Sequence, residues 1–102
     1  MKLTGEAKLH VQILSPTQTY FDGPARSVSA VNKVGPFDIL ADHANFFSLL
    51  ETGVVRVGDE HQTLKFPISK GLIKVHNNVI LLFVDIEPAY HTAHTVPKKT
   101  AP

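Results

Sequence analysis

The chain has 102 residues, of which 43% are hydrophobic and 19% charged, so its length and composition fit one domain with a single modest core. Its formal net charge of +1 provides no dominant field for holding nucleic acid or an anionic membrane. The sequence contains no cysteine, which excludes a disulfide framework and cysteine-ligated metal sites.

The first half of the chain alternates apolar and polar residues with the period of two that is typical of a half-buried strand. Residues 8–14 show this pattern first, and Ser15-Pro16-Thr17 ends it. Extended chain resumes at residues 19–21, after which Asp22-Gly23-Pro24 predicts a second turn. Two further strands are predicted at residues 25–31 and 37–40.

Residues 46–50 have the sequence Phe-Phe-Ser-Leu-Leu, which predicts either a short strand or a single helical turn. The two rings also allow two interpretations. Phe46 and Phe47 either plug one end of the core or form an exposed apolar rim that awaits a partner.

The second half of the chain predicts four more strands, at residues 53–57, 63–68, 71–76 and 79–84. Pro67 indicates a sheet edge or a bulge, because proline cannot donate to a strand ladder. Asn77-Asn78 predicts a two-residue hairpin turn, since asparagine tolerates positive φ. The last strand is apolar on both faces, so we expect it deep between two layers.

These patterns predict an all-β fold, a two-layer β-sandwich of about eight to ten short strands. No apolar spacing typical of a long amphipathic helix occurs in the sequence. We expect residues 1–87 to form the sandwich. Residues 88–102 contain three prolines and few apolar residues, so we expect them to form a flexible, loosely attached tail.

Residue types that could carry chemistry lack a suitable context. His91 and His94 have spacing that could place two imidazoles on one helical face, but nearby prolines disfavour that helix and no carboxylates accompany them. Asp42 and His43, with scattered serines, supply the types of a hydrolytic triad without a nucleophile elbow. The glycines form no phosphate-binding motif. We therefore expect no metal, no cofactor and no catalytic site.

Several segments follow one another in a characteristic order, and in that order they resemble the ATP synthase epsilon chain, which is called delta in mitochondria. They are Val-Gln-Ile-Leu-Ser-Pro at 11–16, Tyr-Phe-Asp-Gly at 20–23, Gly-Pro-Phe-Asp-Ile-Leu-Ala-Asp-His-Ala at 35–44, and residues 50–57 and 69–75. The resemblance spans residues 9–86. The chain departs from the family pattern at Asp38, where the family has glycine, at Ala41 and Asn45, where it has proline, and at Lys70, where it has the first of two glycines.

The resemblance implies a β-sandwich that belongs to the central rotor, links the gamma shaft to the c-ring, and supports the coupling of ion translocation to ATP synthesis. It implies a non-catalytic subunit on the cytoplasmic face of the cell membrane, peripheral to the bilayer. The loop region of residues 35–45 would face the c-ring. Its contact residues would be Gly35, Asp38, Asp42, His43 and Asn45. The sequence does not assign the face that binds gamma.

The family usually carries a C-terminal helical hairpin with inhibitory and ATP-sensing roles, and the proline-bearing tail gives no reason to transfer those roles here. The alternative function is a stand-alone β-sandwich module that binds a peptide or a sugar, which would need a concave cluster of exposed aromatic side chains. An enzyme is the third possibility. The balanced charge and the lack of a coiled-coil pattern predict a monomer in isolation.

Overall fold

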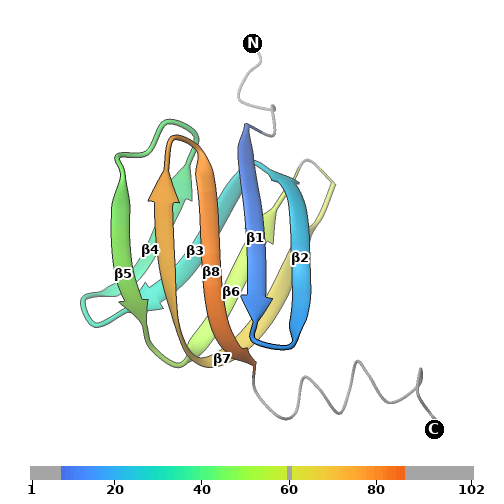
Figure 1. The fold of residues 1–102 in the computed structure, drawn as a ribbon. Helices are drawn as coiled ribbons and strands as arrows, with labels where there is room; N and C mark the ends of the chain where they lie inside the picture. The colour runs from blue at the N-terminus through green and yellow to red at the C-terminus, as the bar shows by residue number, and fades with distance from the viewer. Residues whose placement is uncertain (1–7, 60, 87–102) are drawn as a thin grey trace, which may run out of the picture.

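The computed structural model describes residues 8–59 and 61–86, and within these ranges the chain forms strands and turns but no helix (Figure 1). No described segment is therefore a helix long and apolar enough to cross a membrane. The strands are β1 (Leu9–Ser15), β2 (Gln18–Ala25), β3 (Ser27–Asn32), β4 (Gly35–Leu40), β5 (Phe46–Leu50), β6 (Gly53–Gly58), β7 (Thr63–His76) and β8 (Val79–Ile86). The all-β prediction is confirmed, whereas the predicted tail, 88–102, lies outside the described residues.

The eight strands form one hydrogen-bonded sheet that folds over itself into two layers. Its order is β2-β1-β8-β7-β6-β3-β4, with β5 paired to β7, and β3, β4 and β6 lie behind β5, β8, β1 and β2 in Figure 1. Strand β1 pairs with β8 in parallel, and the other pairs are antiparallel. The two layers are joined through β7, which belongs to both.

Strand β7 is continuous where the sequence predicted two separate strands. Residues 63–68 pair with β6, and the chain then continues beside β8 and β5. A register shift against β8 lies between Ile68 and Lys70. This irregularity lies next to Pro67, where a bulge was predicted because proline has no N–H group to donate. It lets β7 bend from the back layer into the front layer.

The core lies between the two layers and is hydrophobic throughout. Among the described residues every buried side chain is apolar, and none is polar or charged. The alternation predicted for the first strand is confirmed, because Leu9, Val11 and Ile13 are at most 1% exposed. Burying a side chain of this size stabilises the fold by roughly 1.5–3 kcal/mol.

The turn predicted at Asp22-Gly23-Pro24 is wrong, because β2 continues through these residues to Ala25. Gly23 pairs with Val11, and Pro24 pairs with His10. Strand β2 ends the sheet and pairs on one side only. A proline is tolerated in such an edge strand, since its missing N–H group can face away from the ladder.

The prediction that the last strand lies buried on both faces is also wrong. Burial alternates along β8, with Ile80, Leu82 and Val84 buried and Phe83 44% exposed. The strand is central within its layer, between β1 and β7. Only one of its faces meets the opposite layer, so its other apolar side chains lie on the outside of the sandwich.

The remaining open predictions are settled by β5 and by the turn after β7. Residues 46–50 form a strand, β5, and not a helical turn. The two rings differ, because Phe46 packs against the core and Phe47 is exposed. Phe46 packs edge-on against Phe37 with 5.4 Å between ring centroids, whereas Phe47 is 62% exposed. The predicted hairpin turn is confirmed, with φ of 49° at Asn77 and 66° at Asn78.

Candidate functional site

Apolar side chains stand in register across four strands on the outer face of the front layer. Leu49 of β5 pairs with Leu72 of β7, and Leu72 pairs with Phe83 of β8. Phe83 pairs in turn with Leu14 of β1. Paired residues of neighbouring strands project to the same face, so these four side chains form one line. We call Leu14, Leu49, Leu72 and Phe83 the apolar row.

The apolar row is open to solvent and borders a shallow groove. Leu49 is 65% exposed, and the groove has a volume of about 500 Å³. The groove is lined by Pro16, Leu49, Leu50, Glu51, Ser69, Lys70, Gly71, Leu72, Phe83, Val84 and Asp85. At its border, Lys70 Nζ and Asp85 Oδ2 form an ion pair at 4.0 Å. An exposed apolar area with a charged rim is typical of a protein–protein contact surface.

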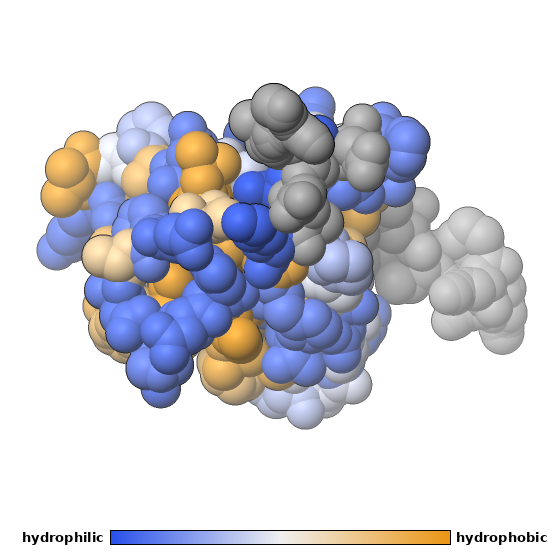
Figure 2. All heavy atoms as spheres, turned by 90° about the horizontal axis from the view of Figure 1, so that it is seen from above, coloured by the Kyte–Doolittle hydropathy of each residue, from blue (hydrophilic) through white to orange (hydrophobic). Residues whose placement is uncertain are grey.

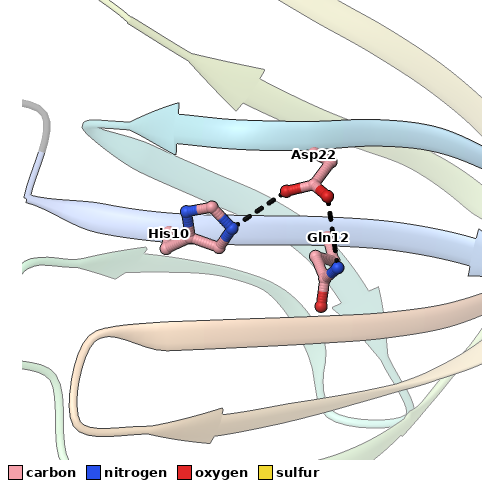
Figure 3. Close-up of polar contacts among 3 residues, drawn as sticks. All are labelled: His10, Gln12 and Asp22. Atoms are coloured by element: carbon pink, nitrogen blue, oxygen red, sulfur yellow. Dashed lines mark hydrogen bonds and ion pairs between the residues drawn. The ribbon is translucent and has the colours of Figure 1, made fainter.

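Three polar side chains lie beside the apolar row on the outer face of β1 and β2 (Figure 3). The Asp22 carboxylate is 2.9 Å from His10 Nε2 and accepts a second hydrogen bond from Gln12 Nε2 at 3.3 Å. His10 and Asp22 are about half exposed. Ion pairs at such exposed positions contribute little to stability, about 0–1 kcal/mol. These residues give the apolar row a polar flank.

The structure brings together three of the five residues predicted to contact the ring. Asp42, His43 and Asn45 share the loop between β4 and β5. Gly35 begins β4 at its other end, roughly 17 Å from the loop at the usual rise of a strand. It has a φ of 138° after the β3–β4 turn. Asp38 lies in the middle of β4, where its carboxylate accepts a hydrogen bond of 2.6 Å from Ser29 Oγ.

The loop of residues 41–45 is fastened to the turn between β7 and β8. The Asp42 backbone N–H donates to Asn78 Oδ1 at 2.6 Å, and Asn78 Nδ2 donates to Asp42 Oδ1 at 3.1 Å. The Asn77 backbone N–H donates to Asn45 Oδ1 at 3.0 Å. Sequence reasoning assigned Asn77 and Asn78 only to the turn. Their contact with the loop could have been suspected from the residue type, because glycine would also adopt the positive φ of this turn and asparagine adds a polar side chain.

The loop also has contacts of its own that place the His43 ring. The His43 backbone N–H donates to Leu40 O at 3.2 Å, and its Nδ1 lies 2.7 Å from Ala44 O. The ring packs edge-on against Phe46, with 5.7 Å between centroids. Figure 2 looks down on this end of the sandwich and shows a largely hydrophilic surface with separate hydrophobic patches.

Groups that could hold a metal ion were sought among the described residues. In residues 8–59 and 61–86 no three His, Asp or Glu side chains gather as a metal ion would need. His91 and His94, the pair considered from the sequence, lie outside these ranges.

Comparisons with known proteins agree with one another on the kind of domain this is. Residues 8–87 match the family described as "ATP synthase, Delta/Epsilon chain, beta-sandwich domain". The ATP synthase epsilon chain of Synechococcus sp. is 32% identical over 91 residues, which cover 89% of this chain and 64% of the relative. The epsilon chain of Caulobacter vibrioides is 38% identical over 69 residues, covering 68% of this chain and 80% of the relative.

Solved structures share the fold. The central stalk and c-ring structure of the Tetrahymena thermophila mitochondrial ATP synthase contains a chain with a TM-score of 0.68 and 18% identity, covering 86% of this chain and 72% of that one. A chain of the Euglena gracilis mitochondrial ATP synthase gives a TM-score of 0.72 at 16% identity, covering 91% and 64%. The chain spans about half to two thirds of the length of the Synechococcus and Thermosynechococcus relatives it matches.

Proposed function

The chain belongs to the family of ATP synthase delta/epsilon chain β-sandwich domains, and on this premise we propose that it is a central-rotor subunit of a rotary ATP synthase. In this role it links the gamma shaft to the c-ring and supports the coupling of ion translocation to ATP synthesis. It would lie at the periphery of the membrane, on its cytoplasmic face. The relatives named above are ATP synthase epsilon chains, which supports this role.

The observation that carries the proposal is the apolar row. A protein that acts alone has little reason to keep a line of four apolar side chains on its surface, two of them exposed, beside a groove. Phe83 and Leu49 are 44% and 65% exposed, and covering them with a partner would remove apolar surface from water. We assign this face to the gamma shaft, because a shaft with an apolar stripe would cover such a row and remove it from water.

The c-ring contact falls to the loop of residues 41–45. The loop that carries Asp42, His43 and Asn45 joins β4 to β5 at one end of the sandwich, whereas the apolar row runs across the strands of the front layer (Figure 1). The two partners would thus meet different sides of the domain. A joint between a ring and a shaft requires that arrangement, because both must be held at once.

The subunit would have no active site of its own. Its described interior contains only apolar side chains, so it provides no buried polar group for acid–base or nucleophilic work. What the role requires instead is stiffness and a complementary surface. A close-packed two-layer sandwich supplies the first, and the apolar row with the loop supplies the second.

The test is capture of gamma and the c-ring from the same organism by the tagged chain. Leu49→Gln should weaken capture of gamma by about tenfold, because burying an unpaired amide against an apolar partner costs about 1–3 kcal/mol. Val34→Gln is the matched control. Val34 is an aliphatic residue that is 95% exposed at the β3–β4 turn and is not a member of the apolar row, so its replacement should leave capture unchanged.

The loop is tested separately by two variants. Asp42→Asn keeps the positive φ and the hydrogen-bond acceptor but removes the charge, and His43→Ala removes the ring. Both should reduce retention of the c-ring and leave gamma bound. A folded chain that captures neither partner would refute the rotor role, and the stand-alone binding module would then take first place.

A further inference from the structure

A single side chain of the β7–β8 turn grips the loop of residues 41–45. We propose that Asn78 is a positioning residue for the ring contact: its amide clamps Asp42, so that Asp42 and His43 are presented to the c-ring in one fixed arrangement. This inference rests on the proposed function and adds a residue to it. Asn78 itself would not touch the ring, because it acts through the loop.

The grip has two points and therefore fixes direction as well as distance. Asn78 uses both halves of its amide on the same residue, accepting from the Asp42 backbone N–H at 2.6 Å and donating to Asp42 Oδ1 at 3.1 Å. One bond would leave the Asp42 side chain free to rotate about it. The first bond holds the backbone of Asp42 and the second restrains its carboxylate.

The backbone that Asn78 holds has an unusual conformation. Asp42 has a φ of 66°, in the left-handed region that residues other than glycine rarely adopt. Such a conformation persists where its surroundings determine it. The short hydrogen bond from its N–H group to Asn78 is a contact that does so. Without it the loop would gain access to other backbone conformations.

The anchor is stiffer than the loop it holds. The Asn78 carbonyl accepts a hydrogen bond from the His10 N–H group of β1 at 2.9 Å. Val79, the next residue, pairs with both His10 and His76. The turn is thus hydrogen-bonded to, or part of, three neighbouring strands. Through Asn78 it fixes the position of Asp42, which lies 36 residues earlier in the chain, relative to the sheet.

The turn alone does not explain asparagine at this position. Glycine satisfies positive φ at no steric cost and would close the same hairpin. Asparagine adds a side-chain amide with one acceptor oxygen and two donor N–H groups, and here the amide bonds to Asp42 through both its oxygen and its nitrogen. Asn77 provides the contrast, because its link to the loop comes from its backbone N–H group, which donates to Asn45.

That contrast supplies a matched pair of variants, Asn78→Gly and Asn77→Gly. Both keep a residue suited to positive φ in the same turn. Only Asn78→Gly removes the clamp, since the Asn77 backbone donor survives its replacement. Both variants should fold, and Asn78→Gly should melt only modestly below Asn77→Gly, because the two hydrogen bonds that it loses lie in an exposed loop.

The experiment makes three measurements on the full chain: amide hydrogen exchange at Asp42, binding to purified c-ring, and binding to purified gamma. In Asn78→Gly we expect exchange at Asp42 to be roughly tenfold faster and c-ring binding roughly tenfold weaker, because the partner must then order the loop itself. Gamma binding should be unchanged. Asn77→Gly should match the wild type in all three measurements.

Two results would overturn the inference in different ways. If the wild type binds the ring and Asn78→Gly binds it equally well, the positioning role is wrong while the rotor role stands. If the wild type does not bind the ring, both fall together, because a loop without a partner needs no positioning. Loss of gamma binding in Asn78→Gly would show a general defect of the fold and would also count against a local role.

Discussion

Replacing Gly71 by alanine should destabilise the fold by about 2 kcal/mol, within the range of roughly 1–3 kcal/mol for overpacking a core. A Cβ atom at this position would lie 2.6 Å from Phe83 O, 3.0 Å from Val84 Cγ1 and 3.2 Å from Val84 Cα. Two of these three atoms belong to the backbone of β8, so no change of rotamer can move them away. The strands β7 and β8 would have to separate locally.

Gly23→Ala is the matched control for this prediction. Gly23 also lies within a strand, and the nearest atom to its Cβ would be Phe21 Cζ at an ordinary 3.8 Å. Both replacements restrict the unfolded chain alike, which favours folding by about 0.4–1 kcal/mol. The difference between the two variants therefore isolates the clash at position 71.

The assay is thermal or urea unfolding of both variants beside the wild type. A loss of about 2 kcal/mol should lower the melting temperature of a domain of this size by roughly 8–16 °C. Leu72 of the apolar row is the residue directly after Gly71, so the Gly71→Ala variant should also bind gamma less tightly. Equal stability of the Gly71→Ala and Gly23→Ala variants would refute the close-approach argument.

Three further predictions concern other parts of the domain. Hydrogen bonds from the backbone N–H groups of His61 and Gln62 lower the pKa of Asp59 in the folded protein. The charged carboxylate therefore stabilises the fold at pH values above the ordinary carboxyl pKa. This stabilisation is lost as the pH falls through the lowered pKa of the folded state. Asp59→Asn should therefore flatten the acid limb of stability measured by urea unfolding. Leu82→Ala should lower the free energy of unfolding by about 2–5 kcal/mol, because Leu82 is 0% exposed. Leu81 lies on the outer face of β8, so Leu81→Ala should lower it by less than about 1 kcal/mol in the same assay. His10→Ala should change stability by less than about 1 kcal/mol despite its 2.9 Å contact with Asp22, and a larger loss would contradict the exposed-pair argument.

Local patterns in the sequence predicted most of the strands. The alternation of residues 8–14 predicted the buried side of β1, and Asn77-Asn78 predicted the hairpin turn, because both depend on neighbouring residues alone. The turn at residues 22–24 failed for a non-local reason. Proline and glycine are turn residues in most settings, but β2 lies at a sheet edge where both are tolerated, and sheet order is not visible in a local pattern.

The candidate site was predictable only in part for the same reason. The family resemblance indicated the loop that contains Asp42 and His43. It did not indicate the partner of that loop, because Asn78 is separated from Asp42 by 36 residues and both residues suit a turn on their own. The apolar row was missed because an apolar strand reads as buried on both faces, although only one face of β8 meets the other layer.

The two proposed contacts share one short strand, which bears on how force would pass between them. Strand β5 begins directly after the loop of residues 41–45, and it carries Leu49 of the apolar row three residues further on. It pairs with β7 in register from Phe46 opposite Val75 to Leu50 opposite Gly71. A load applied at the loop by the ring would act along β5 and shear this ladder, in which all bonds must yield together. The joint would thus be as stiff as the β5–β7 pairing. Force from the ring reaches β5 only if the loop itself does not yield. The hydrogen bonds from Asn78 to Asp42 hold the loop, because they join it to the turn between β7 and β8.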